Sequence, residues 1–189
     1  LSRALIELRQ WHITHPELYI SINLSALDFE SVNLVANIEH TLNAIKVPAS
    51  AVVFEITESV MMRDSEKAQQ SMEKLKQLGC RIYMDDFGTG YASLTYLKRF
   101  PVDVLKIDKS FVNDIGVDKG DEAIINSTLT LAKSLGKECV AEGVETIQQL
   151  RFLQAKDCEY FQGYLFSKPV PGDAIGPLLD KSWHQEFQG

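Results

Sequence analysis

Long hydrophobic runs are missing from this sequence, and cysteines are few. No apolar stretch approaches the roughly 18–20 residues that a membrane-spanning helix needs, so no membrane contact is expected from this segment. The cysteines Cys80, Cys139 and Cys158 form no C-x-x-C pair and are odd in number, which favours buried, reduced thiols. Both absences predict a cytoplasmic chain, although a longer parent protein could be anchored in a membrane through other domains.

Positive charge is scarce as well. The chain has 19 Lys and Arg residues against 26 Asp and Glu residues, which gives a formal net charge of -7. Non-specific binding of nucleic acid depends on Lys and Arg, so a DNA or RNA polymer is not an expected partner. An acidic protein can still bind a small anionic ligand where metal ions neutralise the charge at the point of contact.

The sequence also lacks an initiating methionine and a signal peptide. It begins at Leu1, and we expect it to be a piece of a longer polypeptide. Its 189 residues suit one domain with a sizeable core. We predict a single domain over residues 1–189, truncated at its N-terminus, with a tail over residues 181–189.

A repeated alternation of strand-like and helix-like segments organises the whole sequence. Short runs rich in Val, Ile, Phe and Tyr are typical of buried parallel strands, and they cover residues 19–25, 52–58, 81–87, 104–112, 138–145 and 160–167. Apolar residues at helical spacing lie between them, over residues 1–12, 31–45, 64–78 and 121–135, and after a capping box of Thr146 and Gln149. Asp64 and Gly79 are expected to begin and end the helix of residues 64–78.

Strands that alternate with helices imply a parallel sheet, either closed as a barrel or open and doubly wound. No G-x-G-x-x-G loop follows the first strand, which weakens a dinucleotide-binding fold. Each strand also carries a polar residue after a few apolar ones, and the carboxyl ends of barrel strands meet at one mouth, whereas an open sheet gathers ligands at one switch point. These polar residues are Asn23, Glu55, Asp85, Lys106, Glu142 and Gln162. The pattern predicts an α/β chain with a (β/α) barrel.

Acidic residues dominate the motifs around these positions. The motifs are SINLS, FEITES, MDDFGTGYASL, LKIDKSF, AEGVE and FQGYLFS, and they add Glu58, Asp86, Asp108 and Glu145. Carboxylates crowded at one mouth stay ionised only beside positive charge. Hard divalent cations take oxygen ligands from Asp, Glu and Asn, and no histidine falls in these motifs, which argues against Zn²⁺ and for Mg²⁺ or Mn²⁺.

The adjacent pair Asp85–Asp86 is the sharpest detail. Neighbouring side chains on a regular strand point to opposite faces, so both reach the mouth only where the strand breaks. Gly88-Thr89-Gly90 supplies that break. One aspartate could then bridge two metal ions roughly 3.5–4 Å apart while the other binds one of them, as in two-metal phosphodiester hydrolysis.

The motifs NLSA, FEITES, DDFGTGYASL, LKIDKSF, AEGVET and QGYLFSKP, in this order and spacing, resemble those of EAL-domain proteins over nearly the whole chain. The resemblance implies a modified TIM barrel, of whose eight strands six would be present here. It implies hydrolysis of cyclic di-GMP to the linear dinucleotide in bacterial signalling, with Mg²⁺ or Mn²⁺ as cofactor and Ca²⁺ as inhibitor. It also implies a homodimer and fusion to upstream regulatory domains.

The resemblance assigns the metal ligands. Asn23, Glu55 and Asp85 would bind one ion, and Asp85 and Asp86 would bind the second. Glu142 is a further candidate ligand.

The resemblance assigns the remaining roles as well. Lys106 and Glu142 would position and activate the attacking water, and Gln162 would help to hold water or substrate. Glu58 would anchor the loop of residues 86–94, which in this family couples the metal site to a dimer interface. Two further carboxylates would support the site from a second layer, namely Asp108 and Glu145.

Two departures from the family pattern matter. The loop has GYASL where the family commonly has GYSSL, and Ala92 is a mild change. The Glu-Ala-Leu signature is absent, because in the family it lies upstream of Leu1, with a glutamate that binds metal and a nearby arginine that contacts phosphate. We therefore expect little or no activity from this segment alone.

Two other functions stay open. Some EAL-like domains bind cyclic di-GMP without cleaving it, but every downstream ligand position is filled here, which favours an active parent protein. A Schiff-base lyase with Lys106 as nucleophile would also suit a barrel, but the dense carboxylates would hold the lysine protonated.

Overall fold

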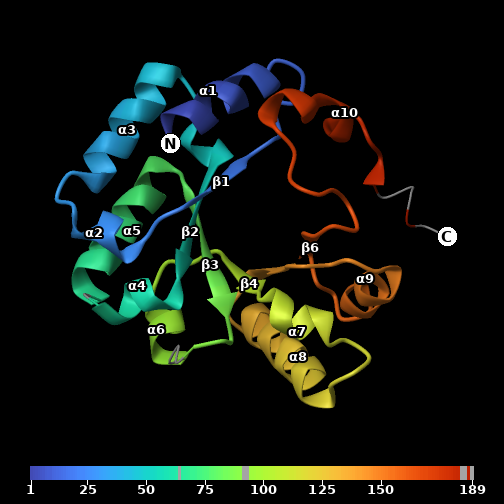
Figure 1. Ribbon diagram of the computed structural model, residues 1–189. Helices are drawn as coiled ribbons and strands as arrows, with labels where there is room; N and C mark the ends of the chain where they lie inside the picture. The colour runs from blue at the N-terminus through green and yellow to red at the C-terminus, as the bar shows by residue number, and fades with distance from the viewer. Residues whose placement is uncertain (64, 91–93, 184–186, 188–189) are drawn as a thin grey trace. The chain divides into compact units, whose positions relative to one another are not determined.

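The computed structural model describes residues 1–63, 65–90, 94–183 and 187 (Figure 1), apart from the side chains of residues 61–63, 65 and 94–96. The chain forms two compact units, Leu1–Val104 and Leu105–Gly189, and each is described by itself. Within the described part of the chain, no helix has the length and apolar composition of a membrane-spanning segment.

The first unit is built on three parallel strands, β1 (Ile20–Asn23), β2 (Val52–Thr57) and β3 (Arg81–Phe87). β2 pairs with both of the others, and the register sets Asn23 opposite Glu55 and Thr57 opposite Asp85. Side chains alternate between the two faces along each strand, so residues in register lie on the same face. The expected segments of residues 19–25, 52–58 and 81–87 are all confirmed as strands within one or two residues of these bounds.

The two faces of this sheet differ sharply in polarity. The apolar face carries nearly fully buried side chains, namely Phe54, Ile56, Ile82 and Met84. Helices α1 (Ser2–Trp11), α3 (Leu34–Ile45) and α5 (Ser65–Leu78) follow one another around the strands (Figure 1) and bury one stripe each. Those stripes include Leu5, Leu8, Ile38, Leu42, Met72 and Leu75. The opposite face carries Asn23, Glu55 and Asp85, so the sheet holds polar groups away from the helix-covered core.

Shorter elements complete the first unit. They are α2 (Ala26–Glu30), η1 (Ala49–Ala51), α4 (Glu58–Arg63) and α6 (Leu94–Arg99). The predicted helix of residues 31–45 is too long at its start, because Ser31 is extended and α3 begins only at Leu34. Ser25 and Asp28 form a capping box that nucleates α2 as a separate turn. Gly79, at φ +104°, ends α5 as predicted, whereas the proposed cap Asp64 lies outside the described residues.

The second unit has strands β4 (Val104–Ile107, which starts at the boundary), β5 (Glu138–Ala141) and β6 (Tyr160–Phe161) in that spatial order. β5 and β6 are parallel, with Val140 opposite Tyr160. The helices of this unit are α7 (Lys109–Asn113), α8 (Lys119–Ser134), α9 (Ile147–Gln154), η2 (Gly172–Ala174) and α10 (Gly176–Leu179). The predicted capping box of Thr146 and Gln149 opens α9, as expected.

All three strands of this unit are shorter than predicted. Residues 104–112 are not one strand, because the Asp108 carboxylate accepts a hydrogen bond from the Ser110 N–H at 2.9 Å and starts α7. The segment of residues 138–145 ends at Ala141, two residues before Gly143 at φ +66°. β6 ends at Phe161 and is followed by a turn, so the polar residues Glu142 and Gln162 lie just beyond their strands.

The three cysteines are free and buried, as predicted. Burial raises the pKa of the Cys80 thiol to about 11 and that of Cys158 to about 12, and it raises the pKa of Cys139 as well. Neutral thiols in these places pack as small apolar groups.

Candidate active site

The polar face of the first unit collects side chains from all three of its strands. Asn23, at the end of β1, is exposed, while Glu55 on β2 is only 9% exposed. Asp85 is half-buried and lies opposite Thr57, so it stands two residues further along the sheet than the Asn23–Glu55 pair. The register therefore staggers the three oxygen donors instead of setting them at one height.

Asp86 kinks β3 near its polar end, one residue before the strand ends at Phe87. Its φ of +54° puts it in the left-handed region, which few residues other than glycine adopt and which Asp tolerates better than most. Its N–H donates to Asp85 Oδ1 at 3.2 Å, and the backbone N–H and hydroxyl of Thr89 donate to its carbonyl oxygen at 3.3 and 2.8 Å. This backbone conformation cancels the strand alternation between Asp85 and Asp86.

The carboxylates of Asp85 and Asp86 come close together as a result. Each offers an oxygen atom within 4.8 Å of the other's. Two negative charges at that separation repel each other unless a cation lies between them. Paired carboxylate oxygens are the donors that hard divalent cations prefer, so these two residues fit the metal ions expected from the sequence.

Glu58 holds the turn that follows Asp86. It begins α4, and its Oε1 accepts a hydrogen bond from the Gly88 N–H at 3.2 Å. A Cβ at Gly90 would lie 2.2 Å from Glu58 Oε2, so the carboxylate rests directly against the turn. Glu58 thus contacts the loop that it was expected to anchor, of which residues 91–93 lie outside the described residues.

The second unit contributes a buried ion pair. Lys106 on β4 is 3% exposed, and its Nζ lies 2.6 Å from Oε1 of Glu142, the residue after β5. The Glu142 N–H donates to the carbonyl oxygen of Ile107 at 3.1 Å, which fixes this carboxylate beside the end of β4. Removing two charges from water is costly, so a buried pair at the ends of two neighbouring strands makes this position a candidate functional site.

Gln162 lies beyond β6, next to the backbone that follows Glu142. Its N–H donates to the Ala141 carbonyl at 2.8 Å, and its own carbonyl accepts from the Val144 N–H at 3.0 Å. Among the described residues its side-chain amide has no hydrogen-bond partner, and the residue is exposed. The side chain is therefore available to a ligand.

Asp108 and Glu145 have local partners. The Asp108 carboxylate accepts from the N–H and hydroxyl of Ser110, at 2.9 and 2.5 Å, and caps α7. Glu145 is exposed, and its N–H donates to Gln149 Oε1 at 2.8 Å in the capping box of α9. These contacts belong to helix starts, and the supporting role expected for both carboxylates stays a prediction.

Two residues of the polar face were not anticipated. Arg81 and Tyr83 precede Asp85 on the same face of β3, and the Arg81 guanidinium lies 5.2 Å from the centre of the Tyr83 ring. Tyr19 packs against Tyr83 edge-on, with ring centroids 6.3 Å apart. Alternate residues of a strand share a face, so Tyr83 and Arg81, two and four residues before Asp85, could have been assigned to this face from the sequence.

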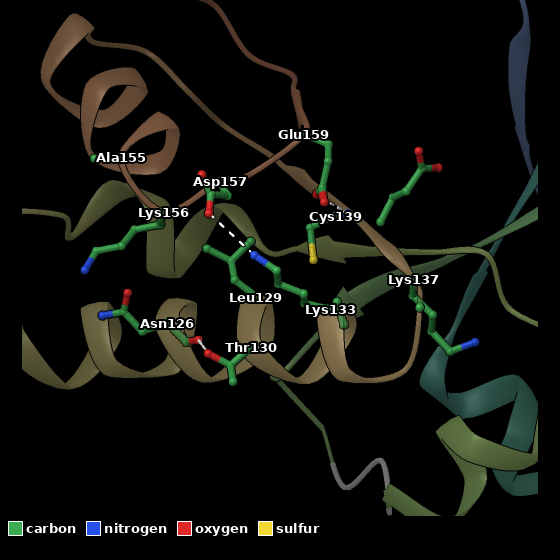
Figure 2. A pocket seen from close by; sticks show the side chains of 13 residues that line it. Asn126, Leu129, Thr130, Lys133, Lys137, Cys139, Ala155, Lys156, Asp157 and Glu159 are labelled. Atoms are coloured by element: carbon green, nitrogen blue, oxygen red, sulfur yellow. Dashed lines mark hydrogen bonds and ion pairs between the residues drawn. The ribbon is translucent and has the colours of Figure 1, made fainter.

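A cavity of about 630 Å³ opens elsewhere in the second unit. Figure 2 shows it lined by Asn126, Thr130 and Lys133 of α8, Cys139 near the start of β5, and the segment of residues 155–159. Lys133 and Asp157 form an ion pair across it at 3.6 Å. It lies at the amino end of β5, whereas Glu142 follows the carboxyl end, so it is distinct from the candidate site.

Parallel strands that alternate with helices and carry acidic and amide side chains at their carboxyl ends define a domain of the (β/α)-barrel class. The sequence profile of the EAL domain family matches residues 1–169. The chain belongs to the EAL-domain family, and its fold is a partial EAL-type TIM barrel, with six strands among the described residues. The family and fold expected from the motifs are confirmed.

Several known proteins are similar to this chain. The cyclic di-GMP phosphodiesterase NbdA of Pseudomonas aeruginosa is 40% identical over 180 residues, which are 95% of this chain and 23% of that protein. The solved c-di-GMP complex of the MucR phosphodiesterase, also of Pseudomonas aeruginosa, is 39% identical with a TM-score of 0.88, over 92% of this chain and 71% of that one.

A third similar protein is Klebsiella pneumoniae BlrP1, solved with manganese and cyclic di-GMP. It is 30% identical with a TM-score of 0.82, over 90% of this chain and 43% of that one. The chain spans about a quarter of the length of the curated relatives it matches.

Proposed function

We propose that this chain carries the catalytic residues of a cyclic di-GMP phosphodiesterase, which hydrolyses the cyclic dinucleotide to its linear form with Mg²⁺ or Mn²⁺. The buried Lys106–Glu142 pair, at the carboxyl ends of two neighbouring strands, is the observation that carries the proposal. Relatives support the substrate, because NbdA is named a cyclic di-GMP phosphodiesterase and MucR was solved with c-di-GMP. BlrP1 complexes with manganese and with calcium support a divalent cation, with calcium as the proposed inhibitor.

In this proposal the metal ligands are Asn23, Glu55, Asp85, Asp86 and Glu142. When bound, two divalent cations would lower the pKa of a water molecule and offset the charge that builds on the phosphate. The chain's own contribution is to hold these oxygens in place. Asp86 does so through its left-handed backbone, and Glu58 does so by fixing the Gly88 turn next to it.

Lys106 and Glu142 act on the attacking water. The Lys106 ammonium, held 2.6 Å from Glu142, donates a hydrogen bond that orients the water, and the Glu142 carboxylate accepts from it. Gln162 offers an amide that can hold water or a substrate oxygen. Asp108 and Glu145 keep the segments after β4 and β5 in place through their helix caps. That both groups of residues serve one reaction is part of the proposal and rests on family membership.

The lyase alternative is disfavoured by the same ion pair. A Schiff-base lysine must be a free amine, whereas a carboxylate at 2.6 Å favours the ammonium form of Lys106. A receptor that binds cyclic di-GMP without cleaving it would be recognised by binding with no turnover.

A homodimer and upstream regulatory domains belong to the proposal too. Relatives are several times longer than this chain. The proposed dimer surface is the helix and loop after Asp86, in which Leu97 and Phe100 are buried inside the chain itself. Among the described side chains of that region, Lys98 and Arg99 are exposed and would be the ones to make a dimer contact. The cytoplasmic location stays a prediction.

We also propose that residues 1–189 alone hydrolyse cyclic di-GMP weakly. The sequence contains no Glu-Ala-Leu tripeptide, and among the described residues β1 pairs only with β2. A single-partner strand leaves its other edge open to association. The test compares the rate of cyclic di-GMP hydrolysis by residues 1–189 with the rate of a chain extended upstream by about 60 residues, which is two βα units of about 30 residues each. Equal activity of the two proteins would contradict this part.

The main test is hydrolysis of cyclic di-GMP with Mn²⁺ by the full-length protein and by its Lys106→Ala variant. Lys106→Ala should lower kcat roughly a hundredfold or more, because a positioned proton-handling group contributes about 10²–10⁴ in rate. KM should change little. Lys119→Ala is the matched control, since Lys119 pairs with Glu122 at 3.0 Å on the surface. An effect confined to KM would show that Lys106 only binds substrate.

A further inference from the structure

Three aromatic rings gather at the turn that follows Gln162. Phe166 lies edge-on to Trp183 and to Phe187, with ring centroids 5.9 and 5.6 Å away and interplanar angles of 85° and 88°. Trp183 and Phe187 stack on each other at 6.4 Å with their planes 9° apart. The Lys181 ammonium lies 4.6 Å from the Trp183 ring centre. Trp183 and Phe187 thus pack against one side chain of the turn, and edge-on pairs of this kind are the favoured aromatic geometry.

Hydrogen bonds to the backbone that follows β5 hold the same turn from another side. The Leu165 N–H donates to the Val144 carbonyl at 3.0 Å, and the Phe166 and Ser167 N–H groups donate to the Gly163 carbonyl at 3.1 and 3.3 Å. A Cβ on Gly163 would lie 2.1 Å from the Val144 carbonyl oxygen, so these backbones touch. Residues 163–167 are therefore fixed through hydrogen bonds on one side and through the Phe166 ring on the other.

Gln162 depends on this turn for its orientation. Its side-chain amide has no hydrogen-bond partner among the described residues, so the backbone alone sets the point and direction at which this side chain leaves the chain. The Gln162 backbone leads directly into Gly163, the first residue of the turn of residues 163–167. A looser turn would displace the base of the side chain and so widen the region over which the amide is spread.

We propose that Trp183 and Phe187 are positioning residues, which hold Phe166 and thereby fix the turn that orients Gln162. We call the packing of Trp183 and Phe187 against Phe166 the aromatic clamp. The role of the clamp in turnover rests on the proposed phosphodiesterase function, whereas its role in ordering the turn does not. Trp183 and Phe187, which belong to the predicted tail of residues 181–189, would then be part of the working unit.

The test uses the full-length protein and the variants Trp183→Ala, Phe187→Ala and Trp183→Phe. Phe152→Ala is the matched control, because Phe152 is also a half-buried aromatic ring of the second unit with a lysine, Lys156, 5.8 Å from its centre. Amide hydrogen exchange over residues 160–168, without substrate, reports the order of the turn. Hydrolysis of cyclic di-GMP with Mn²⁺ reports kcat and KM.

Trp183→Ala and Phe187→Ala should speed exchange of the turn by roughly tenfold, since a local opening then costs less free energy. They should lower kcat roughly tenfold to a hundredfold, because a misplacement of about 1 Å can cost about a hundredfold in rate. KM should change less. Trp183→Phe should restore both readouts, and Phe152→Ala should leave both unchanged.

Each of the other outcomes would contradict one part of this proposal. Unchanged exchange in both alanine variants overturns the clamp. Faster exchange with unchanged kcat overturns its role in orienting Gln162. If the wild-type protein shows no hydrolysis, the proposed function fails, and the exchange result alone then decides for or against the clamp.

Discussion

Lys106 Nζ and Glu142 Oε1 lie 2.6 Å apart, in a place where the lysine side chain is 4% exposed and the glutamate side chain 17% exposed. Both charges have been withdrawn from water, and each compensates for the other. Buried pairs of this kind add little to stability compared with apolar residues of similar volume, yet they are strongly destabilising to break. The pair therefore fits the catalytic role proposed for it better than a role in stability.

The pairing predicts that the stability and the activity of the protein can be separated by mutation. Lys106→Ala should lower the free energy of unfolding by about 3–5 kcal/mol, since it leaves the Glu142 carboxylate buried without its partner. The double variant Lys106→Met, Glu142→Leu should recover most of that loss and remain inactive. Urea unfolding and the cyclic di-GMP assay measure the two quantities. Recovery of activity in the double variant would contradict the catalytic assignment.

Asp85 should be required for stabilisation by metal ions. Mn²⁺ at about a hundred times its Kd should stabilise the full-length protein by about 2.7 kcal/mol, because the ion binds the folded state alone. Asp85→Asn should abolish that gain and Mn²⁺-dependent hydrolysis.

The control is Asp173→Asn, at an exposed position in η2. It should leave the response to Mn²⁺ intact in thermal melts and in calorimetric titration. A full Mn²⁺ response in Asp85→Asn would rule out the assignment of Asp85 as a ligand.

Gly163 should tolerate no side chain. A Cβ there would lie 2.1 Å from the Val144 carbonyl oxygen and 2.3 Å from its nitrogen, which are backbone atoms and cannot rotate away. Gly163→Ala should cost about 3 kcal/mol of stability, at the upper end of ordinary overpacking. Gly176→Ala is the control, since nothing lies within 4 Å of a Cβ at Gly176. Equal unfolding midpoints for the two variants would contradict this packing.

Alkaline pH should weaken the fold through Cys80. Burial raises the pKa of this thiol from 9.0 to about 11, although the nearby Lys76 ammonium acts in the opposite direction. The folded protein holds the proton more tightly than the unfolded chain, so this stabilisation is full below pH 9 and is lost as the pH rises towards 11.

Cys80→Ala removes that titration. The stability difference between wild type and variant should shift in favour of the variant by about 2 kcal/mol between pH 9 and pH 11, at about 1.4 kcal/mol per pK unit. Chemical unfolding at a series of pH values measures the shift. Parallel curves for the two proteins would show that the Cys80 thiol does not titrate differently on folding.

The sequence predicted the strands and their polar ends because those signals are local. Asn23, Glu55, Asp85 and Lys106 were located by a short apolar run followed by one polar residue, and the family motifs added the rest. The start of α7 was missed because it lies inside a strand-like run. There the Asp108 side chain caps the helix and overrides the β propensity of the neighbouring residues.

Contacts between distant residues were beyond the reach of the sequence. Nothing in the spacing of Phe166 and Trp183 indicates that the two rings meet, because the intervening segment has no periodic pattern. The two-residue stagger of Asp85 against Glu55 was missed for a similar reason, since register depends on how β2 and β3 pair and not on either strand alone.

The contact of Gly163 with Val144 has a mechanical consequence. Val144 follows Glu142 by two residues, and Gly163 follows Gln162 directly, so the strand ends that carry the carboxylate and the amide are in contact without a spacer. A displacement of one end must carry the other with it. In the proposed mechanism Glu142 activates water and Gln162 holds substrate, so a displacement that reaches β5 would shift both groups together, and a regulator would need to move only one strand to change both.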